Sequence, residues 1–395
     1  MRSINSYLIL KCEQLPSTLY INKQALTHNL DFIKNLVGKK VRFSSVIKGN
    51  AYGHGIEVFV PLAENCGINH FSVFDANEAL RAYNASRQNA GIMIMGMIDV
   101  FELDWAVQKG VEFYVFDFDR LFNALEAARR IGKPARIHLE VETGMNRTGF
   151  DERDVDKLIK ILQKNKKYYV LEGICTHFAG AESIANYARV LTQIKRYKNH
   201  VKKFRRHSIK PKYRHVASSA ATVTYPETRL DMVRIGIMQF GFWPSPETFI
   251  NYISDKKDKE DPLQRIITWK SKVMDTKYVK TGEFIGYGTS YMARNNMKIA
   301  TIPVGYAHGY SRSLSYQGRV LINGHRVDVI GNVNMNVLIV KITDIPETKR
   351  GDEVVLIGKQ EGAEITVASF SDFSDQLNYE MLTRLPEEIP RIIEI

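Results

Sequence analysis

The chain has 395 residues, a formal net charge of +12, 44% hydrophobic residues and 25% charged residues, a composition typical of a soluble globular protein with two or three domains. This composition excludes a disordered chain, and no apolar run approaches the length of a membrane span. The apolar stretch near the amino terminus is too short for a signal peptide, and Cys12, Cys66 and Cys175 lack the spacing of a zinc site or a disulfide framework. We therefore expect a cytoplasmic protein without a metal site.

Much of the positive charge is concentrated in one segment, residues 195–214. Its cations are Lys195, Arg196, Lys198, Lys202, Lys203, Arg205, Arg206, Lys210, Lys212 and Arg214. Such a segment can bind nucleic acid, but it is more often the solvated face of a helix, and no nucleic-acid motif accompanies it. We favour the helix face and expect neither a nucleic-acid partner nor a membrane partner.

Residues 17–248 alternate short apolar runs with longer amphipathic ones. Eight apolar runs are strand candidates, at 42–47, 70–74, 92–95, 113–116, 135–141, 169–175, 213–216 and 232–237. Helical patterns such as 23–36, 76–85, 121–131 and 154–164 lie between them. Eight units predict an α/β fold with a (β/α)8 barrel of the TIM type, because an open sheet would show fewer strands and a glycine-rich dinucleotide turn.

The pattern changes in residues 249–395. A polar linker at 251–262 precedes short alternating runs at 266–273, 297–304, 318–322, 325–330, 337–342 and 353–357. Turn signals such as Asn323-Gly324 and Arg350-Gly351 separate them, which predicts a mainly antiparallel β domain. We expect a short strand at 6–10, within residues 1–16, to join this domain.

The first predicted barrel strand ends in the segment Lys48-Gly49-Asn50-Ala51-Tyr52-Gly53-His54-Gly55. Burial among apolar neighbours disfavours an ammonium group, so a lysine here can form a Schiff base with a carbonyl cofactor. A lone lysine at a strand end is more often a solvated cap. The whole segment resembles the lysine segment of the alanine racemase family. This resemblance implies that Lys48 binds pyridoxal 5′-phosphate and that Tyr52 helps hold the phosphate.

The loops after the seventh and eighth strands are candidates for holding the phosphate, as in other barrels. Ser219 offers a hydroxyl, and Gly236 and Ile237 offer backbone N–H groups, although a Ser-Ala loop is more often a helix start. Both loops resemble the same family, in which the residue matching Arg234 faces the pyridine nitrogen. Arginine stays protonated and cannot donate its proton to the ring, which makes the ring a weaker electron sink.

The fifth predicted strand continues into a turn that ends in Arg147-Thr148-Gly149. Alternation places His138, Glu140 and Glu142 on one face. The run resembles the family segment whose arginine, here Arg147, contacts the substrate carboxylate and orients the catalytic tyrosine. Where some members carry a carbamylated lysine, this chain has Glu140, and we expect Glu140 to hold Arg147 in a charge-assisted pair. Glu142 and Asn146 replace the usual aspartate and glycine.

Racemisation needs a second base opposite Lys48, since a proton leaves one face of the α-carbon and another reaches the opposite face. The segment around Tyr287 resembles that of the family's catalytic tyrosine, and a cation such as Arg147 would stabilise its phenolate. Most tyrosines between glycines are simply hairpin residues. His177 lies in a Thr-His-Phe-Ala run that resembles the family's, where the histidine supports this tyrosine; a lone histidine is more often structural.

Further matches extend to the carboxyl terminus. Met335 stands in a Cys-Met-Asp element altered at its flanks, with Asn336 in place of aspartate, and implies a backbone contact with substrate. Tyr379 matches a tyrosine that helps hold the phosphate, and His308 replaces an aspartate. In the family the lysine and tyrosine of one site come from different subunits, which implies a homodimer with shared active sites.

The combined resemblance implies an isomerase that interconverts L-alanine and D-alanine and supplies D-alanine for peptidoglycan. Two alternatives remain open. The altered Asn146 and Asn336 leave room for a racemase of serine or another amino acid, and a non-catalytic cofactor-binding homologue would need no second base. A decarboxylase on a related barrel would release carbon dioxide.

Overall fold

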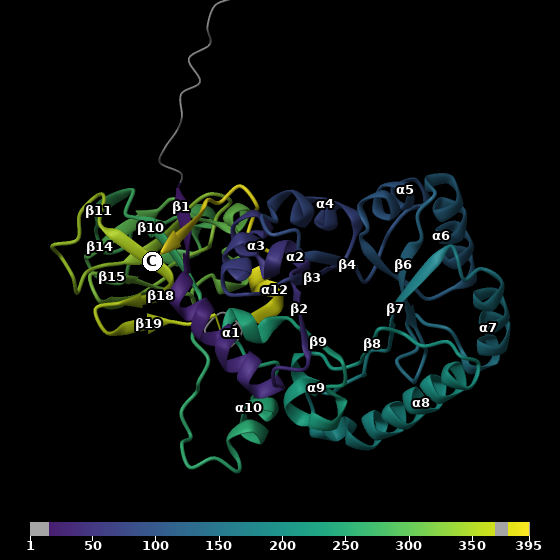
Figure 1. Ribbon diagram of the computed structural model, residues 1–395. Coiled ribbons are helices and arrows are strands. Elements are labelled where there is room, and N and C mark those ends of the chain that lie inside the picture. Colours follow the sequence, from purple (N-terminus) through teal and green to yellow (C-terminus); the bar gives the residue numbers. More distant parts are fainter. Residues whose placement is uncertain (1–15, 368–377, 395) are drawn as a thin grey trace, which may run out of the picture. The chain divides into compact units, whose positions relative to one another are not determined.

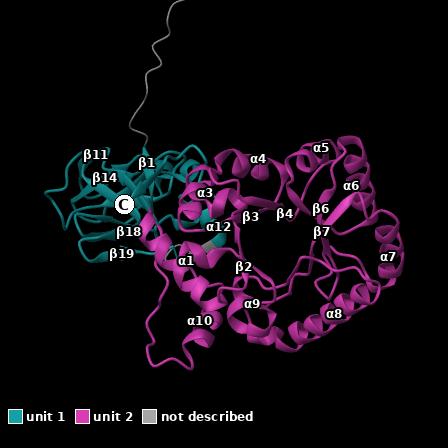
Figure 2. Cartoon of the chain, in the orientation of Figure 1, with its two compact units in different colours: residues 1–21, 267–394 teal, residues 22–266, 395 magenta. Residues whose placement is uncertain are grey.

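The computed structural model describes residues 16–367 and 378–394. The chain forms two compact units, one of residues 22–266 and one of residues 267–394 together with those up to 21 (Figure 2). The domain boundaries expected after residues 16 and 248 therefore lie at other positions, after residues 21 and 266. In the described ranges, no helix is long and apolar enough to cross a membrane.

The larger unit is a nearly closed barrel of parallel strands, which confirms the predicted fold (Figure 1). Its strands pair in chain order, and the last returns to the first. Two backbone hydrogen bonds, from Asp231 to Arg214 and from Arg234 to Ala217, connect the remaining pair. The strands are β2 (Arg42–Val46), β3 (His70–Val73), β4 (Gly91–Ile94), β5 (Glu112–Val115), β6 (Ala135–Glu140), β7 (Tyr169–Cys175), β8 (Tyr213–His215) and β9 (Met232–Ile235).

Helices lie outside the ring of strands (Figure 1). Their starts follow local chemistry: Asp75, Asp99 and Asp117 each accept a backbone N–H as N-cap residues. Gly110 and Gly132 end two of them in the left-handed conformation. The helices are α1 (Lys23–Val37), α3 (Ile56–Asn65), α4 (Ala76–Ala85), α5 (Val100–Lys109), α6 (Phe118–Ile131), α7 (Val155–Lys164), α8 (Tyr187–Arg206), α9 (Ser219–Thr224) and α10 (Pro246–Ile253).

The basic segment lies largely on α8. The helix buries Tyr197 and Phe204, and its cations lie at exposed or partly exposed positions. Lys203 pairs with Asp156 at 2.9 Å. The sequence indicated a helix face for residues 195–214; α8 carries this segment as far as Arg206, and Lys210, Lys212 and Arg214 lie beyond the helix.

The smaller unit is mainly antiparallel β structure, as predicted. One sheet has the order β16-β15-β18-β10-β1-β20, and another has β11-β14-β17. Asn323 and Gly324, with φ of 50° and 73°, form the two-residue turn between β15 and β16. The strands are β1 (Ser17–Asn22), β10 (Ile267–Lys272), β11 (Asp275–Val279), β12 (Phe284–Ile285), β13 (Tyr291–Met292), β14 (Met297–Ile302), β15 (Arg319–Ile322), β16 (His325–Asp328), β17 (Leu338–Lys341), β18 (Glu353–Gln360), β19 (Ala363–Ile365) and β20 (Arg391–Glu394).

One expectation about the amino terminus needs correction. The sequence pattern places residues 17–21 in the barrel, whereas β1 pairs antiparallel with β10 and belongs to the β unit. The apolar alternation of β1 fits this sheet equally well, so only the pairing decides its place. The predicted strand at 6–10 lies outside the described residues.

Candidate functional site at the carboxyl ends of the barrel strands

Lys48 follows β2 directly and begins a short turn, α2 (Lys48–Tyr52). This turn is left-handed: φ is 62° at Gly49 and between 51° and 54° at Asn50, Ala51 and Tyr52. Left-handed backbone costs about 1–2 kcal/mol for each residue other than glycine. Such strain persists only where the surroundings enforce it, and it is concentrated at functional sites.

The strained turn is held by Glu78 and Arg81 from outside and by the side chain of its own Asn50. The carboxylate of Glu78 on α4 accepts the backbone N–H of Asn50 at 3.1 Å and that of Phe74 at 2.9 Å. Oδ1 of Asn50 accepts the N–H of Ile56 at 3.1 Å and Nη2 of Arg81 at 2.7 Å. These bonds fix the direction in which Lys48 leaves the barrel. No sequence pattern indicated the role of Glu78, because α4 is distant from the turn along the chain.

The charge environment of Lys48 favours the neutral amine. Its side chain is open to solvent at the strand end, yet surrounding protein lowers its pKa below the ordinary 10.5, mainly through desolvation. The cation of Arg147 lowers this pKa further, and the anion of Glu78 opposes the change. A lysine of this kind is a better nucleophile and base near neutral pH than an ordinary surface lysine.

Three predicted phosphate ligands lie together beside this turn. The N–H of Gly236 donates to Oγ of Ser219 at 2.9 Å. A Cβ on Gly236 would lie 2.5 Å from the hydroxyl oxygen of Tyr52, so only glycine leaves that space. Ile237 is buried and begins the 3-10 turn η4 (Ile237–Phe240) directly after Gly236. The corner offers two hydroxyls and backbone N–H groups, which suit a phosphate monoester.

Arg234 lies at the end of β9 and is buried in the barrel mouth. Its Nη1 donates to Nδ1 of His215 at 2.7 Å and to the carbonyl of His215 at 2.9 Å. Its Nη2 donates to the carbonyls of Thr176 at 3.0 Å and Val216 at 3.3 Å. These four bonds all involve the terminal nitrogens of Arg234 and fix the orientation of its guanidinium. None of the four uses Nε.

The turn after β6 differs from the expectation. Glu140 is buried and accepts the hydroxyl of Thr148 at 2.7 Å, but no ion pair joins Glu140 to Arg147 among the described residues. Burial raises the pKa of Glu140, while the Thr148 hydrogen bond and the nearby Arg147 cation oppose that rise. The expected charge-assisted pair between Glu140 and Arg147 is therefore not among the described contacts, and Oε2 of Glu140 accepts the Thr148 hydroxyl instead.

The two substitutions in the same turn have a structural reason. The carboxylate of Glu142 accepts the backbone N–H of Gly144 and, at 2.9 Å, that of Asn146. Asn146 has a φ of 56°, and asparagine is one of the few residues that adopts this region readily. Asn146 thus has a backbone conformation that glycine also adopts readily.

His177 follows β7 and lies close to the cations of the mouth. Its backbone carbonyl accepts Nε2 of Gln193 at 3.3 Å. Desolvation lowers its pKa to about 3, and the charges of Arg234, Arg147 and Lys48 act in the same direction. The imidazole is therefore neutral at physiological pH, with one nitrogen able to donate and the other able to accept a hydrogen bond.

Three predicted site residues belong to the β unit. Tyr287 is 77% exposed at the start of the turn η5 (Tyr287–Thr289), and Met335 is 56% exposed with its carbonyl accepting the N–H of Ala307 at 2.9 Å. Tyr379 lies on α12 (Asn378–Thr383) and is partly buried.

Nδ1 of His308 accepts the N–H of Gly305 at 3.2 Å, so it can cap this turn as an aspartate would.

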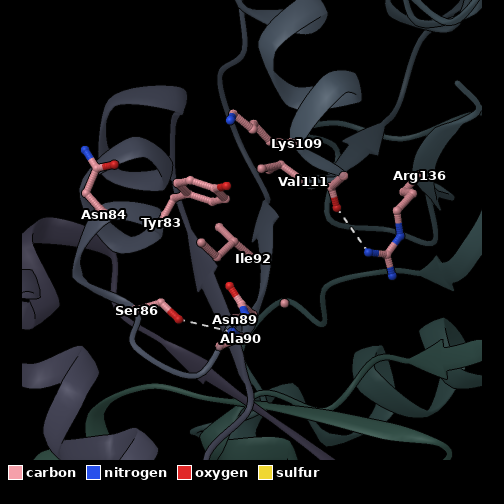
Figure 3. A pocket seen from close by; sticks show the side chains of 11 residues that line it. Tyr83, Asn84, Ser86, Asn89, Ala90, Ile92, Lys109, Val111 and Arg136 are labelled. Atoms are coloured by element: carbon pink, nitrogen blue, oxygen red, sulfur yellow. Dashed lines mark hydrogen bonds between the residues drawn. The ribbon is translucent and has the colours of Figure 1, made fainter. Parts of the chain in front are cut away.

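A pocket of about 470 Å³ lies at the opposite end of the barrel from Lys48. Figure 3 shows its lining, which includes Tyr83, Lys109 and Arg136 around the amino-terminal ends of β4, β5 and β6. Arg136 donates to the carbonyl of Gly110 at 3.1 Å there. Because none of the predicted site residues lines this pocket, it is separate from the candidate site.

Comparisons with known proteins agree with these features. The sequence model described as alanine racemase, N-terminal domain, matches residues 21–244, and that of the C-terminal domain matches residues 266–393. The alanine racemase of Leptospira interrogans serogroup Icterohaemorrhagiae serovar copenhageni is 33% identical over 396 residues, covering 100% of both chains. The solved alanine racemase of Clostridium difficile 630 has a TM-score of 0.88 and 30% identity, covering 96% of each chain. That of Bacillus anthracis with bound L-Ala-P has a TM-score of 0.87 and 28% identity, covering 97% of this chain and 96% of that chain.

Proposed function

We propose that this chain, which belongs to the alanine racemase family, interconverts L-alanine and D-alanine with pyridoxal 5′-phosphate as cofactor. The observation that carries the proposal is the lysine of lowered pKa at a strand end, next to the corner of Tyr52, Ser219 and Gly236. This corner suits a phosphate group because the hydroxyls of Tyr52 and Ser219 converge on the backbone at Gly236, where the lack of a Cβ permits their approach. When bound, pyridoxal 5′-phosphate supplies a carbonyl for the lysine and a ring that delocalises the charge left on the α-carbon.

Each residue has a distinct role in this proposal. Ser219, Gly236, Ile237, Tyr52 and Tyr379 hold the phosphate, and Arg234 faces the pyridine nitrogen without giving up a proton. Arg147 binds the substrate carboxylate and, at the same time, favours the neutral amine of Lys48. The backbone of Met335 contacts the substrate. His177 is kept neutral by its surroundings and supports the catalytic tyrosine. Glu140, which accepts the Thr148 hydroxyl, supports Arg147.

Lys48 and Tyr287 are the two bases. Each holds or accepts a proton on one side of the substrate α-carbon, so that removal on one side and delivery on the other invert the centre. Tyr287 is exposed in the single chain, which suits a residue that completes the site of a partner subunit. We therefore place the lysine of one subunit and the tyrosine of the other in one site of a homodimer.

The biological setting follows from the reaction. D-alanine produced in this way would enter peptidoglycan synthesis, which takes place from cytoplasmic precursors. A cytoplasmic location is supported by Cys66 and Cys175, which are free thiols. Cys12 lies outside the described residues.

Exchange of the α-proton in deuterated water, followed by NMR, tests the reaction. We expect exchange and inversion with alanine for the wild type, and inversion reduced by at least about a hundredfold in Tyr287→Phe. Tyr278→Phe is the matched control, because Tyr278 is 73% exposed in the same unit. Faster inversion of serine would support the serine alternative, and cofactor binding without any exchange would contradict the racemase proposal in favour of a carrier.

Mixing two inactive variants tests the shared site. Random dimers of Lys48→Ala and Tyr287→Phe chains should recover about one quarter of wild-type activity, because half of the dimers contain one intact site. If both residues of a site came from the same chain, mixing would restore no activity.

A further inference from the structure

A continuous chain of buried hydrogen bonds lies behind Arg234 inside the barrel. From Nη1 of Arg234 it runs to Nδ1 of His215 at 2.7 Å, and from Nε2 of His215 to Nδ1 of His138 at 2.8 Å. It continues from Nε2 of His138 to Oε2 of Glu112 at 2.8 Å. His215, His138 and Glu112 are each 0% exposed, and we call these three side chains with Arg234 the buried relay.

The direction of the buried relay follows from the donors available. Arginine can only donate, so Nδ1 of His215 must accept and its proton must be on Nε2. Nε2 of His215 then donates to Nδ1 of His138, whose proton is in turn on Nε2 and is donated to Glu112. A single arginine and a single carboxylate thus fix both histidine tautomers. If the direction of the relay were reversed, the proton of His215 would be on Nδ1 and would face an N–H of Arg234, so two donors would meet without an acceptor.

Glu112 is the anionic end of this chain and has further partners. Nε2 of His70 lies 3.2 Å from the same Oε2, and Nη2 of Arg136 donates to Oε1 at 2.8 Å. Burial alone would raise the pKa of Glu112, but the hydrogen bonds from His138 and His70 outweigh it and hold the pKa below its usual range. Desolvation, followed by the charge of Arg234, lowers the pKa of His215. His215 is therefore neutral, and the Glu112 carboxylate is charged.

The barrel interior is shaped around one bond of the buried relay. A Cβ on Gly173 of β7 would lie 2.2 Å from Nδ1 of His138 and 2.7 Å from Nε2 of His215. Any other residue at this position would separate the two rings. The glycine has no positive φ that would otherwise require it, so the close approach of the histidines is the reason we find for it.

We propose that His215, His138 and Glu112 are positioning residues for Arg234, with the Glu112 carboxylate setting the direction of the whole buried relay. Because His215 is thereby fixed as an acceptor, Nη1 of Arg234 is held in one place and its Nε edge keeps one orientation toward the mouth. This role rests on the proposed function, in which that edge faces the cofactor ring. The other end of the relay is anchored by Arg136, which lines the pocket at the opposite end of the barrel (Figure 3).

Nitrogen NMR of ¹⁵N-histidine-labelled protein without cofactor tests the direction of the relay directly. We expect His215 and His138 to be neutral with the proton on Nε2, each resonance being assigned by its loss in a His→Gln variant. A proton on Nδ1 of His215 would overturn the proposal. Since no cofactor or substrate is present, this result does not depend on racemase activity.

Two pairs of variants test the effect on Arg234. Glu112→Gln has one acceptor oxygen and an amide donor, so it cannot serve both histidines and Arg136 as the carboxylate does. We expect a shifted absorbance band of bound pyridoxal phosphate and a kcat lower by about tenfold, with KM for alanine changed less than about twofold. Glu172→Gln is the control, because Glu172 also pairs with Arg136, at 2.8 Å, but does not contact the relay histidines through any described bond.

Gly173→Ala keeps every charge and breaks the His138–His215 bond, so it should reproduce the Glu112→Gln spectrum. Gly91→Ala adds a methyl 2.8 Å from Cδ2 of His70, beyond Glu112, and should leave the spectrum unchanged. Wild-type spectra and kcat in both Glu112→Gln and Gly173→Ala would overturn the positioning role. If the wild-type protein shows the expected tautomers but does not invert alanine, the proposed function fails. The direction of the buried relay still stands in that case.

Discussion

The hydroxyl oxygen of Tyr52 lies 2.5 Å from the position of a Cβ on Gly236, and the ring carbon that bears it lies 3.1 Å away. These residues come from opposite ends of the barrel sequence, from the turn after β2 and the turn after β9. Their approach is so close that only a residue without a Cβ fits at position 236 without displacing Tyr52.

Gly236→Ala should lower the free energy of unfolding of the cofactor-free protein by about 1–3 kcal/mol, because the methyl group meets the Tyr52 hydroxyl. Tyr52→Phe removes that oxygen, so the double variant should be more stable than expected from the two single changes. Urea unfolding of all four proteins measures this coupling. Additive effects would show that the two groups do not meet.

The ionisation of Lys48 should respond in opposite directions to its two charged neighbours. Its pKa lies below 10.5, so the amine forms at lower pH than in an ordinary lysine. Arg147→Gln removes a charge that lowers this pKa and should move the titration to higher pH, while Glu78→Gln should move it to lower pH. Acetylation of Lys48 as a function of pH, measured by mass spectrometry, reports the amine fraction.

The control for this titration is Arg153→Gln, since Arg153 is highly exposed and pairs with Asp151. It should leave the profile of Lys48 in place. Shifts of the same sign in Arg147→Gln and Glu78→Gln would contradict the electrostatic account.

The left-handed turn depends on Asn50. Asn50→Ala removes the acceptor of two hydrogen bonds and puts alanine at a φ of 54°, so we expect a loss of about 2–3 kcal/mol in stability and slower acetylation of Lys48. Asn89→Ala is the matched control, because Asn89 also has a φ of 54° but is exposed. It should lose about 1 kcal/mol or less. Thermal unfolding of both variants checks the difference, and equal losses would show that the side-chain bonds contribute nothing.

Glu140 should make stability depend on pH in a defined direction. Its folded pKa is raised above 4.5, so between 4.5 and the folded value the native state binds more protons than the unfolded state. Stability contributed by this group is therefore lost as pH rises through that window, and the loss persists at higher pH. Glu140→Gln keeps an acceptor for Thr148. It should therefore reduce the pH dependence of the free energy of unfolding in this window, as measured by urea unfolding.

The same variant tests the role of Glu140 at the site. Removing the anion near Arg147 should lower kcat/KM for alanine while leaving the fold intact. Exposed Glu227→Gln serves as the control for both measurements. An unchanged stability curve and unchanged activity in Glu140→Gln would mean that Glu140 is not ionised and supports no neighbour.

Sequence by itself determined the eight barrel strands, the antiparallel β unit and the place of Lys48 at a strand end. These depend on hydrophobic periodicity and on turn residues close together in the chain, as the Asn323-Gly324 hairpin shows. It also indicated Ser219 and Gly236 as neighbours, because parallel strands of a barrel bring their carboxyl ends to one face.

Tertiary structure decided the contacts between residues distant in the chain. It placed Glu78 under the left-handed turn, gave Glu140 to Thr148 rather than Arg147, and joined Glu112 to His138 across adjacent strands. A strand pattern shows which side chains share a face, but the register of neighbouring strands and the rotamers of buried polar groups choose the partners. Those choices depend on the whole packed interior, because a buried neutral polar group without a partner costs about 1–3 kcal/mol of stability, and a charged one costs more. Each polar group therefore takes the partner that the local geometry offers.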